Sequence, residues 1–202
     1  MMGPQGCGKG TTGSMLAEYL HIPYVATGHM LRNISKEHPW YEEVNNSMNE
    51  GGLVDQKKVA VLLSEELKKD LYKDGFVLDG WYRRMDDVRA YEVPIDVALL
   101  LTISAQTTIK RLSTRRTCSK CGQIFNTITI VPKIEGICDK CGGTLIQRQD
   151  DTEEAILKRL EIYHEETKEV IEYIKSKGIL KEINAEGTPE EVFVLAKQAL
   201  DL

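Results

Sequence analysis

The chain has 202 residues and 42% hydrophobic content, which suffices for one compact core with small inserted subdomains. Its 26 Lys and Arg residues against 31 Asp and Glu residues give a formal net charge of −5, without the basic excess typical of nucleic-acid-binding proteins. It contains no charged-then-apolar signal segment and no long apolar stretch. We therefore expect a cytoplasmic protein that binds small molecules and neither nucleic acid nor a membrane.

The glycine-rich segment at residues 3–11, GPQGCGKGT, is the strongest single signal in the sequence. Its glycines allow tight backbone turns that direct successive N–H groups at phosphate oxygens, and its lysine is placed to reach a transferring phosphate. We predict that the phosphates of ATP bind here. The residues expected to bind them are Gly6, Gly8, Lys9, Gly10 and Thr11.

The two flanks of this loop differ. A helix that begins at the loop would add the positive end of its dipole to the site, and we expect Met15, Leu16, Tyr19 and Leu20 to form its buried face. A buried apolar strand normally precedes such a loop, yet only Met1 and Met2 stand before Gly3. We hypothesise that the strand lies upstream of this chain, or that the sheet lacks it and leaves backbone groups unpaired.

Apolar runs alternate with helical patterns along the rest of the chain. The candidate strands are residues 22–25, 76–78, 97–103 and 180–183. Helical spacing follows a possible N-cap at Asp55 and recurs between Ile156 and Val170, and TPEE at residues 188–191 predicts a capped last helix. This alternation predicts one α/β domain in three layers, with a parallel sheet between helices.

Residues 117–147 break the pattern with glycines and short β-type runs. Cysteines occur there as two CxxC pairs, each followed by glycine: Cys118, Cys121, Cys138 and Cys141. This spacing suits tetrahedral zinc, and so short an insertion with few large apolar groups needs a metal to fold. We predict a structural zinc site without an open coordination position, disulfides being the alternative.

Six segments, in order along nearly the whole chain, resemble the adenylate kinase family. They are GPQGCGKGT, TGHMLR (27–32), GFVLDG (75–80), Arg111 with Arg115-Arg116, RQDD (148–151) and KRL (158–160). The resemblance implies a P-loop NTPase-type core of residues 1–26, 57–113 and 151–202, a nucleoside-monophosphate-binding flap at 27–56, and a mobile zinc-stabilised β lid at 114–150. It also implies a monomer.

The resemblance further implies roles for individual residues. Lys9, Arg83, Arg115, Arg148 and Arg159 would be catalytic and surround the transferred phosphoryl group. Thr27, Arg32, Gly80, Arg83, Asp87, Arg148 and Arg159 would bind the monophosphate substrate. Arg111 and Arg115 would bind ATP, and Asp79 would hold magnesium through water. These assignments suit phosphoryl transfer, in which positioning and charge stabilisation by Lys, Arg and magnesium dominate.

Three positions depart from the family pattern: His29 replaces Asp, Trp81-Tyr82 replace Phe-Pro, and Asp87 replaces Gln. A carboxylate only accepts hydrogen bonds, so Asp87 would favour a base with two donors, such as guanine. The leading expectation is ATP + AMP = 2 ADP. The alternatives are a kinase for another nucleoside monophosphate such as GMP, a non-catalytic nucleotide-binding relative, and a zinc ribbon that binds nucleic acid.

Overall fold

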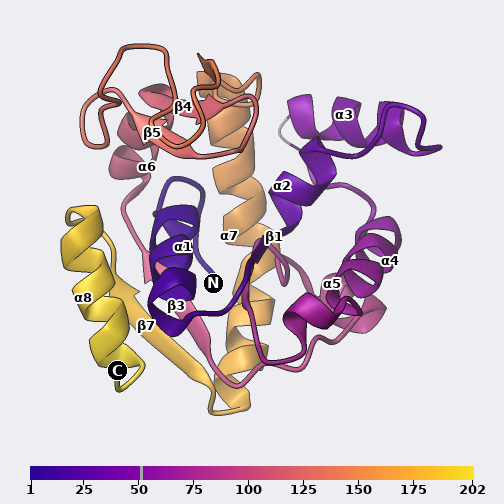
Figure 1. Ribbon diagram of the computed structural model, residues 1–202. Coiled ribbons are helices and arrows are strands. Elements are labelled where there is room, and N and C mark those ends of the chain that lie inside the picture. Colours follow the sequence, from indigo (N-terminus) through magenta and orange to yellow (C-terminus); the bar gives the residue numbers. More distant parts are fainter. Residues whose placement is uncertain (51) are drawn as a thin grey trace.

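The computed structural model describes residues 1–50 and 52–202 (Figure 1). The helices are α1 (Lys9–Leu20), α2 (Thr27–Arg32), α3 (Tyr41–Asn49), α4 (Gln56–Leu67), α5 (Met85–Ala90), α6 (Ala105–Ser113), α7 (Glu153–Ser176) and α8 (Pro189–Ala199), with a 3-10 turn at Asp70–Tyr72. The strands are β1 (Tyr24–Ala26), β2 (Val77–Asp79), β3 (Ala98–Thr102), β4 (Arg115–Cys118), β5 (Ile124–Asn126), β6 (Leu145–Ile146) and β7 (Leu180–Asn184). All four predicted strands form, within one or two residues of their expected bounds.

The central sheet consists of two parallel pairs of strands. β1 pairs with β2, and β3 pairs with β7. Met2 lies beside β3, where its N–H donates to the Leu99 carbonyl at 2.8 Å and its carbonyl accepts from the Leu101 N–H at 3.0 Å. The amino group of Met1 donates to the Leu78 carbonyl of β2 at 2.7 Å. These two residues therefore occupy the position between β2 and β3 that the strand before such a loop normally fills, and they pair with both neighbours.

Successive residues of β3 face opposite sides of the sheet, which separates two hydrophobic clusters. Ala98 and Leu100 pack in the cluster with residues of α4, α5 and α7. Leu99 and Leu101 pack in the cluster with residues of α1 and α8. Because the side chains of a strand alternate between its faces, helices cover both sides of the sheet. This arrangement confirms the predicted three-layer α/β fold.

The buried face of α1 differs from the prediction. Its buried residues are Thr12, Gly13, Leu16 and Ala17, whereas Tyr19 and Leu20 are 50% and 36% exposed. A Cβ atom at Gly13 would lie 2.8 Å from the Tyr24 ring. Small residues thus let α1 approach β1 closely, and the expected face of larger side chains was wrong except at Leu16.

Side-chain caps fix the starts of several helices. Asp55 accepts from the Lys57 and Lys58 N–H groups at the start of α4, and Thr188 forms a capping box with Glu191 at the start of α8. Both caps confirm the sequence prediction. The Thr152 side chain accepts from the Ala155 N–H at the start of α7.

Two insertions extend from the core on the same side of the molecule. Figure 1 shows β4 and β5 at the upper left and α2 with α3 at the upper right. β4 pairs antiparallel with both β5 and β6, which form a small sheet in residues 114–150, here called the lid segment. Residues 27–56 are called the flap segment. Within the part of the chain that the structure describes, no helix has the length and apolar character needed to cross a membrane.

Candidate active site

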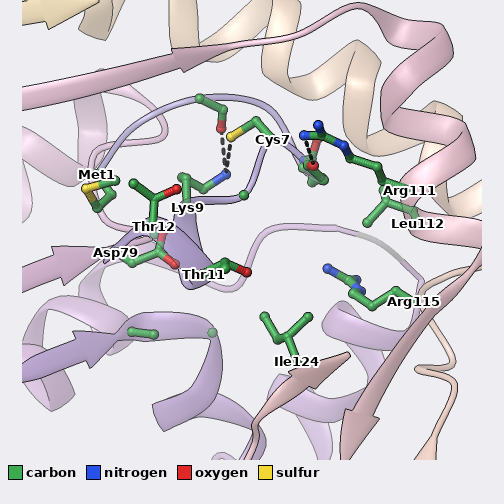
Figure 2. A pocket seen from close by; sticks show the side chains of 18 of the residues that line it. Met1, Cys7, Lys9, Thr11, Thr12, Asp79, Arg111, Leu112, Arg115 and Ile124 are labelled. Carbon is green, nitrogen blue, oxygen red and sulfur yellow. Dashed lines mark hydrogen bonds between the residues drawn. The ribbon is translucent and has the colours of Figure 1, made fainter. Parts of the chain in front are cut away.

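A cleft of about 1470 Å³ lies among the glycine-rich loop, the flap segment and the lid segment. Figure 2 shows Thr11, Asp79 and Arg115 around this space, with Ile124 of β5 close to them. A Cβ atom at Gly10 would lie 3.0 Å from Cδ1 of Ile124, so the lid segment packs directly over the first turn of α1. The structure therefore has a covered cleft.

The glycine-rich loop has the turns that the sequence predicted. Gly6 and Gly8 have φ angles of 76° and 96°, a left-handed region that disfavours residues with a Cβ atom. The amino group of Lys9 donates to the carbonyls of Gly3 and Pro4, each at 2.8 Å, and to Sγ of Cys7 at 3.7 Å (Figure 2). Lys9 thus spans the loop from within, and its ammonium group is hydrogen-bonded to the loop itself.

Six arginines of the described chain line the cleft, and the five other than Arg111 come from separate elements. These five are Arg32 of α2, Arg83 before α5, Arg115 of β4, Arg148 after β6 and Arg159 of α7. Asp150 accepts from Arg159 at 2.9 Å and from Arg32 at 3.1 Å, and both Nε and Nη2 of Arg115 donate to Asp151. Five guanidinium groups against these two carboxylates leave a positive cluster, as an anion site requires.

Among the residues that the structure describes, Arg148 lacks a carboxylate partner although it is largely buried, whereas Arg83, which also lacks one, is exposed. The Nε of Arg148 donates to Oγ1 of Thr117 at 2.9 Å, and no ion pair of Arg148 occurs within residues 1–50 and 52–202. Burial, together with the like charges of Arg115 and Arg32, lowers the pKa of Arg148 to about 8. A buried guanidinium without a carboxylate partner indicates that an anionic ligand completes the site.

Arg159 and Asp150 respond to the same environment. Burial lowers the pKa of Arg159 to about 10, against the raising effect of Asp150. Burial alone would raise the pKa of Asp150, but Arg159 and Arg32 hold it below its usual value. The sequence left open whether Asp150 and Asp151 merely begin a helix. They precede the Thr152 cap of α7 instead, and they position arginines.

Gly80 and Arg83 lie together at the flap side of the cleft, whereas Thr27 is buried beside Gly80 and does not line the cleft itself. The Nε of Arg83 donates to the Gly80 carbonyl at 2.9 Å, and Oγ1 of Thr27 donates to the Asp79 carbonyl at 3.4 Å. A Cβ atom at Gly80, whose φ is 82°, would lie 2.7 Å from Oγ1 of Thr27. Only glycine fits there, and the close approach brings these predicted substrate-binding residues together.

The Asp79 carboxylate lies at the end of β2 and lines the cleft. Its Oδ2 accepts from the Tyr24 hydroxyl at 2.7 Å, and its Oδ1 is buried without a hydrogen-bond partner. Burial and the Asp79 charge raise the pKa of Tyr24, so Tyr24 remains a donor. The unpartnered oxygen fits a role in holding metal-bound water. Sequence reasoning missed Tyr24, because it begins β1 opposite Val77 while Asp79 ends β2 opposite Ala26, so no pattern in the sequence links the two side chains.

Arg111 connects the glycine-rich loop to the segment before α8. Its Nη1 donates to the Ala185 carbonyl at 2.8 Å, and its Nη2 donates to Glu186 and Gly187 carbonyls at 3.0 and 2.8 Å. Arg111 lines the cleft beside these residues. Its planar group is therefore fixed in orientation at this edge of the cleft.

Asp87, Trp81 and Tyr82 have mainly structural contacts. Oδ2 of Asp87 accepts from the N–H groups of Arg83 and Arg84 at 2.8 and 3.0 Å. Trp81 and Tyr82 are buried, and they donate to the carbonyls of Tyr91 and Val93 at 3.0 and 2.9 Å. Asp87 lines a small recess and does not line the cleft itself.

The four lid cysteines form one cluster. Their sulfur atoms all lie within 4.8 Å of one another, and the Cys118–Cys141 and Cys121–Cys138 separations are 3.5 and 3.7 Å. Tetrahedral zinc with sulfur ligands at about 2.3 Å places those sulfurs about 3.8 Å apart. The cysteines therefore fit zinc. Cys7, the remaining cysteine, is buried in the glycine-rich loop.

His29 joins the two insertions across the mouth of the cleft. A Cβ atom at Gly122 of the lid segment would lie 2.5 Å from the His29 ring, and His29 Nε2 lies 3.0 Å from the Asn33 amide. Burial, Arg148 and Arg32 lower the pKa of His29. The residue that departs from the family pattern thus forms a contact between flap and lid.

The glycine-rich loop and the arginine cluster are both suited to binding phosphate oxygens. This places the protein among the P-loop nucleotide-binding proteins. A family model described as adenylate kinase matches residues 1–179. The chain belongs to the adenylate kinase family.

Three named relatives cover nearly the whole chain. An adenylate kinase of Thermodesulfovibrio yellowstonii is 40% identical over 200 residues, which cover 95% of this chain and 93% of the relative. An adenylate kinase of Fervidobacterium nodosum is 39% identical over 199 residues, covering 95% and 91%. An adenylate kinase of Acidothermus cellulolyticus is 36% identical over 208 residues, covering 99% and 96%. The chain is therefore similar to these enzymes along almost its full length.

Proposed function

We propose that this protein catalyses ATP + AMP = 2 ADP. The observation that carries the proposal is the convergence of the glycine-rich loop and five arginines on one cleft. Phosphoryl transfer leaves little covalent work to the protein, so a cleft that positions two nucleotides and stabilises charge is sufficient. Family membership and relatives named adenylate kinase support the same reaction.

Each side of the cleft has a distinct role in this proposal. ATP binds through Gly6, Gly8, Lys9, Gly10, Thr11, Arg111 and Arg115. The monophosphate binds through Thr27, Arg32, Gly80, Arg83, Asp87, Arg148 and Arg159. Lys9, Arg83, Arg115, Arg148 and Arg159 stabilise the charge on the transferred group, since guanidinium groups donate paired hydrogen bonds to phosphate oxygens. Arg32 and Arg159 exchange Asp150 for phosphate as they do so.

Two metals belong to the proposal. Magnesium, when bound, would offset phosphate charge, and Asp79 would hold its water through the buried Oδ1. Zinc would be held by the four lid cysteines as a structural ion with no open position. The proposal also takes residues 27–56 and 114–150 as parts that move on the core of residues 1–26, 57–113 and 151–202, in a monomeric cytoplasmic enzyme.

A coupled assay with magnesium-ATP and AMP, GMP, CMP or UMP in parallel tests the reaction. We expect transfer to AMP. Lys9→Met should lower kcat at least about a hundredfold, because the charge that stabilises the transferring group is lost. Lys168→Met, at an exposed position of α7, is the matched control and should retain activity.

The assay also separates the alternatives. Preference for GMP would identify a kinase with another acceptor. If folded, zinc-loaded protein transferred phosphate to none of the four monophosphates, it would be a non-catalytic relative. Retained activity in Lys9→Met would contradict the role of Lys9.

A further inference from the structure

The Tyr24 side chain lies against the first two turns of α1, next to the glycine-rich loop. A Cβ atom at Gly13 would lie 2.8 Å from Cε2 of the Tyr24 ring, and one at Gly10 would lie 3.6 Å from its hydroxyl oxygen. The ring is therefore packed along α1 in one orientation, with its hydroxyl at the end nearer the loop. Burial and the nearby Asp79 charge raise the pKa of Tyr24, so this hydroxyl keeps its proton.

The register of β1 and β2 directs that hydroxyl to Asp79. Tyr24 lies opposite Val77, and Asp79 follows Val77 by two residues. Residues two apart in a strand face the same side of the sheet, so Tyr24 and Asp79 share one face. The ring reaches along this face to the neighbouring strand, where the hydroxyl donates to Oδ2 of Asp79 at 2.7 Å.

This hydrogen bond distinguishes the two oxygens of the Asp79 carboxylate. Oδ2 accepts from Tyr24, whereas Oδ1 has no hydrogen-bond partner among the described residues. Asp79 lines the same cleft as Thr11 and the loop glycines (Figure 2). The terminal torsion of an aspartate side chain has a broad, roughly two-fold preference, so rotation could present either oxygen. The bond from Tyr24 selects Oδ2 and leaves Oδ1 for a ligand.

We propose that Tyr24 is a positioning residue for magnesium, an inference that rests on the proposed kinase function. Tyr24 acts through Asp79, because its hydroxyl holds Oδ2 and thereby fixes the orientation in which Oδ1 is left for metal-bound water. Residues that hydrogen-bond a metal-binding carboxylate typically change metal affinity or activity by about 10–100-fold when they are replaced. The hydroxyl of Tyr24 therefore contributes to nucleotide binding only when magnesium is present.

A purely structural role for the hydroxyl predicts a different result. Loss of the hydrogen bond would then lower the stability of the fold and would weaken ATP binding equally with and without magnesium. The positioning role predicts a loss that is confined to the magnesium-dependent part of ATP binding. The ratio of the two ATP affinities, in magnesium and in EDTA, separates these accounts and is called the magnesium ratio.

Tyr24→Phe removes the hydroxyl and keeps the ring that packs against Gly13. We expect the magnesium ratio, measured by calorimetry, to fall about tenfold, or to one where the native ratio is smaller. The affinity in EDTA should change little. Tyr72→Phe is the matched control, because Tyr72 is also buried and its hydroxyl donates to Glu66 at 2.9 Å. Neither Tyr72 nor Glu66 is among the described residues that line the cleft, so this variant should keep the native ratio.

Asp79→Asn tests whether Tyr24 acts through Asp79. Asparagine has nearly the shape of aspartate without its charge, so we expect the magnesium ratio to fall in this variant. Adding Tyr24→Phe to Asp79→Asn should lower the ratio no further, because the group that Tyr24 positions is already impaired. Independent effects, in which Tyr24→Phe lowers the ratio equally with and without Asp79, would overturn the inference.

The outcomes separate this inference from the proposed function. An unchanged magnesium ratio in Tyr24→Phe, in a protein that phosphorylates AMP, overturns the inference and leaves the function intact. An equal fall of both ATP affinities overturns it as well, in favour of a structural role. If the native protein phosphorylates no monophosphate, the function fails, and the magnesium ratios of the native protein and Tyr24→Phe still decide the inference. A native ratio of one would overturn it.

Discussion

Arg148 is a single residue whose surroundings favour the binding of an anion. Its guanidinium is buried beside Arg115 and Arg32, which lowers its pKa to about 8. The ion-pair partners of the neighbouring arginines, Asp150 and Asp151, do not reach it within ion-pair distance. The unliganded protein therefore bears the cost of a charge that only an anion in the cleft offsets.

Replacing Arg148 with Met should stabilise the nucleotide-free protein while it impairs catalysis. The buried charge is removed, so we expect Tm at pH 7 to rise, by about 2–4 °C for each kcal/mol recovered. We expect kcat/KM to fall at least about a hundredfold, because a donor to the transferred phosphoryl group is lost. Calorimetry and the coupled assay measure both, with exposed Arg89→Met as control. A lower Tm with normal activity would contradict this account.

The same residue predicts a pH dependence. The folded pKa of about 8 lies below the usual value of 12.5, so above pH 8 the unfolded chain binds the proton that the folded chain has released. The free energy of unfolding therefore rises with pH from this residue. In denaturant titrations between pH 7.5 and 9.5, the advantage of Arg148→Met over the native protein should shrink as pH increases. A constant difference across that range would be inconsistent with a depressed pKa.

Among the elements, the lid segment depends most on a bound metal ion for its folding. Its sheet pairs β4 with the short strands β5 and β6, and the small cluster around Phe125 and Leu145 includes the cysteines themselves. So small an apolar cluster cannot fold the segment alone. Zinc bound by the four sulfurs would supply the remaining free energy.

Removal of zinc should therefore unfold the lid before the core. We expect one zinc ion per chain by elemental analysis, and we expect Cys138→Ser or prolonged chelation to abolish zinc binding and lower Tm by about 5 °C or more. Cys7→Ser is the matched control, because Cys7 lies in the glycine-rich loop and should not change zinc content. Zinc retained in Cys138→Ser, or lost in Cys7→Ser, would contradict the four-cysteine site.

The elements also show what the sequence could and could not predict. The four core strands, the caps at Asp55 and Thr188 and the cysteine cluster followed from local patterns, because spacing and capping chemistry are local properties. The buried face of α1 did not, because its close approach to Tyr24 requires a small residue at Gly13. Hydrophobic periodicity reveals large buried side chains but gives no signal for small buried residues such as glycine.

The anion-binding residues of the site were predictable from the sequence, whereas the contacts between its side chains were less so. The loop glycines, Lys9 and the five arginines all line one cleft. The hydrogen bond between Tyr24 and Asp79 joins residues whose side-chain directions depend on backbone geometry, which no local sequence pattern reveals.

At the scale of the whole molecule, ion pairs of two neighbouring aspartates connect all three parts of the structure. Asp150 binds Arg32 of the flap segment and Arg159 of the core helix α7, and Asp151 binds Arg115 of the lid segment. Breaking a buried pair from one side leaves an uncompensated charge, which is strongly destabilising. The covered cleft of the unliganded protein therefore depends on these carboxylates.

Asp150→Asn should open the molecule when nucleotides are absent. With the carboxylate gone, repulsion between Arg32 and Arg159 favours separation of flap and core, so we expect a larger radius of gyration by small-angle X-ray scattering. ATP analogue with AMP should restore the smaller value. Glu92→Gln removes an exposed pair with Lys177 far from the cleft and should not change the radius. An unchanged radius in Asp150→Asn would contradict the role of Asp150.

We also expect the two aspartates to affect how readily products leave. A nucleotide that enters the cleft exchanges one set of negative partners of the arginines for another, so its net electrostatic gain is smaller than the number of arginines suggests. When ADP departs, Asp150 and Asp151 are already in place to receive the vacated guanidinium groups. A site of bare arginines would retain its product and turn over slowly. We therefore expect these carboxylates to lower the affinity for product and to raise the rate of its release.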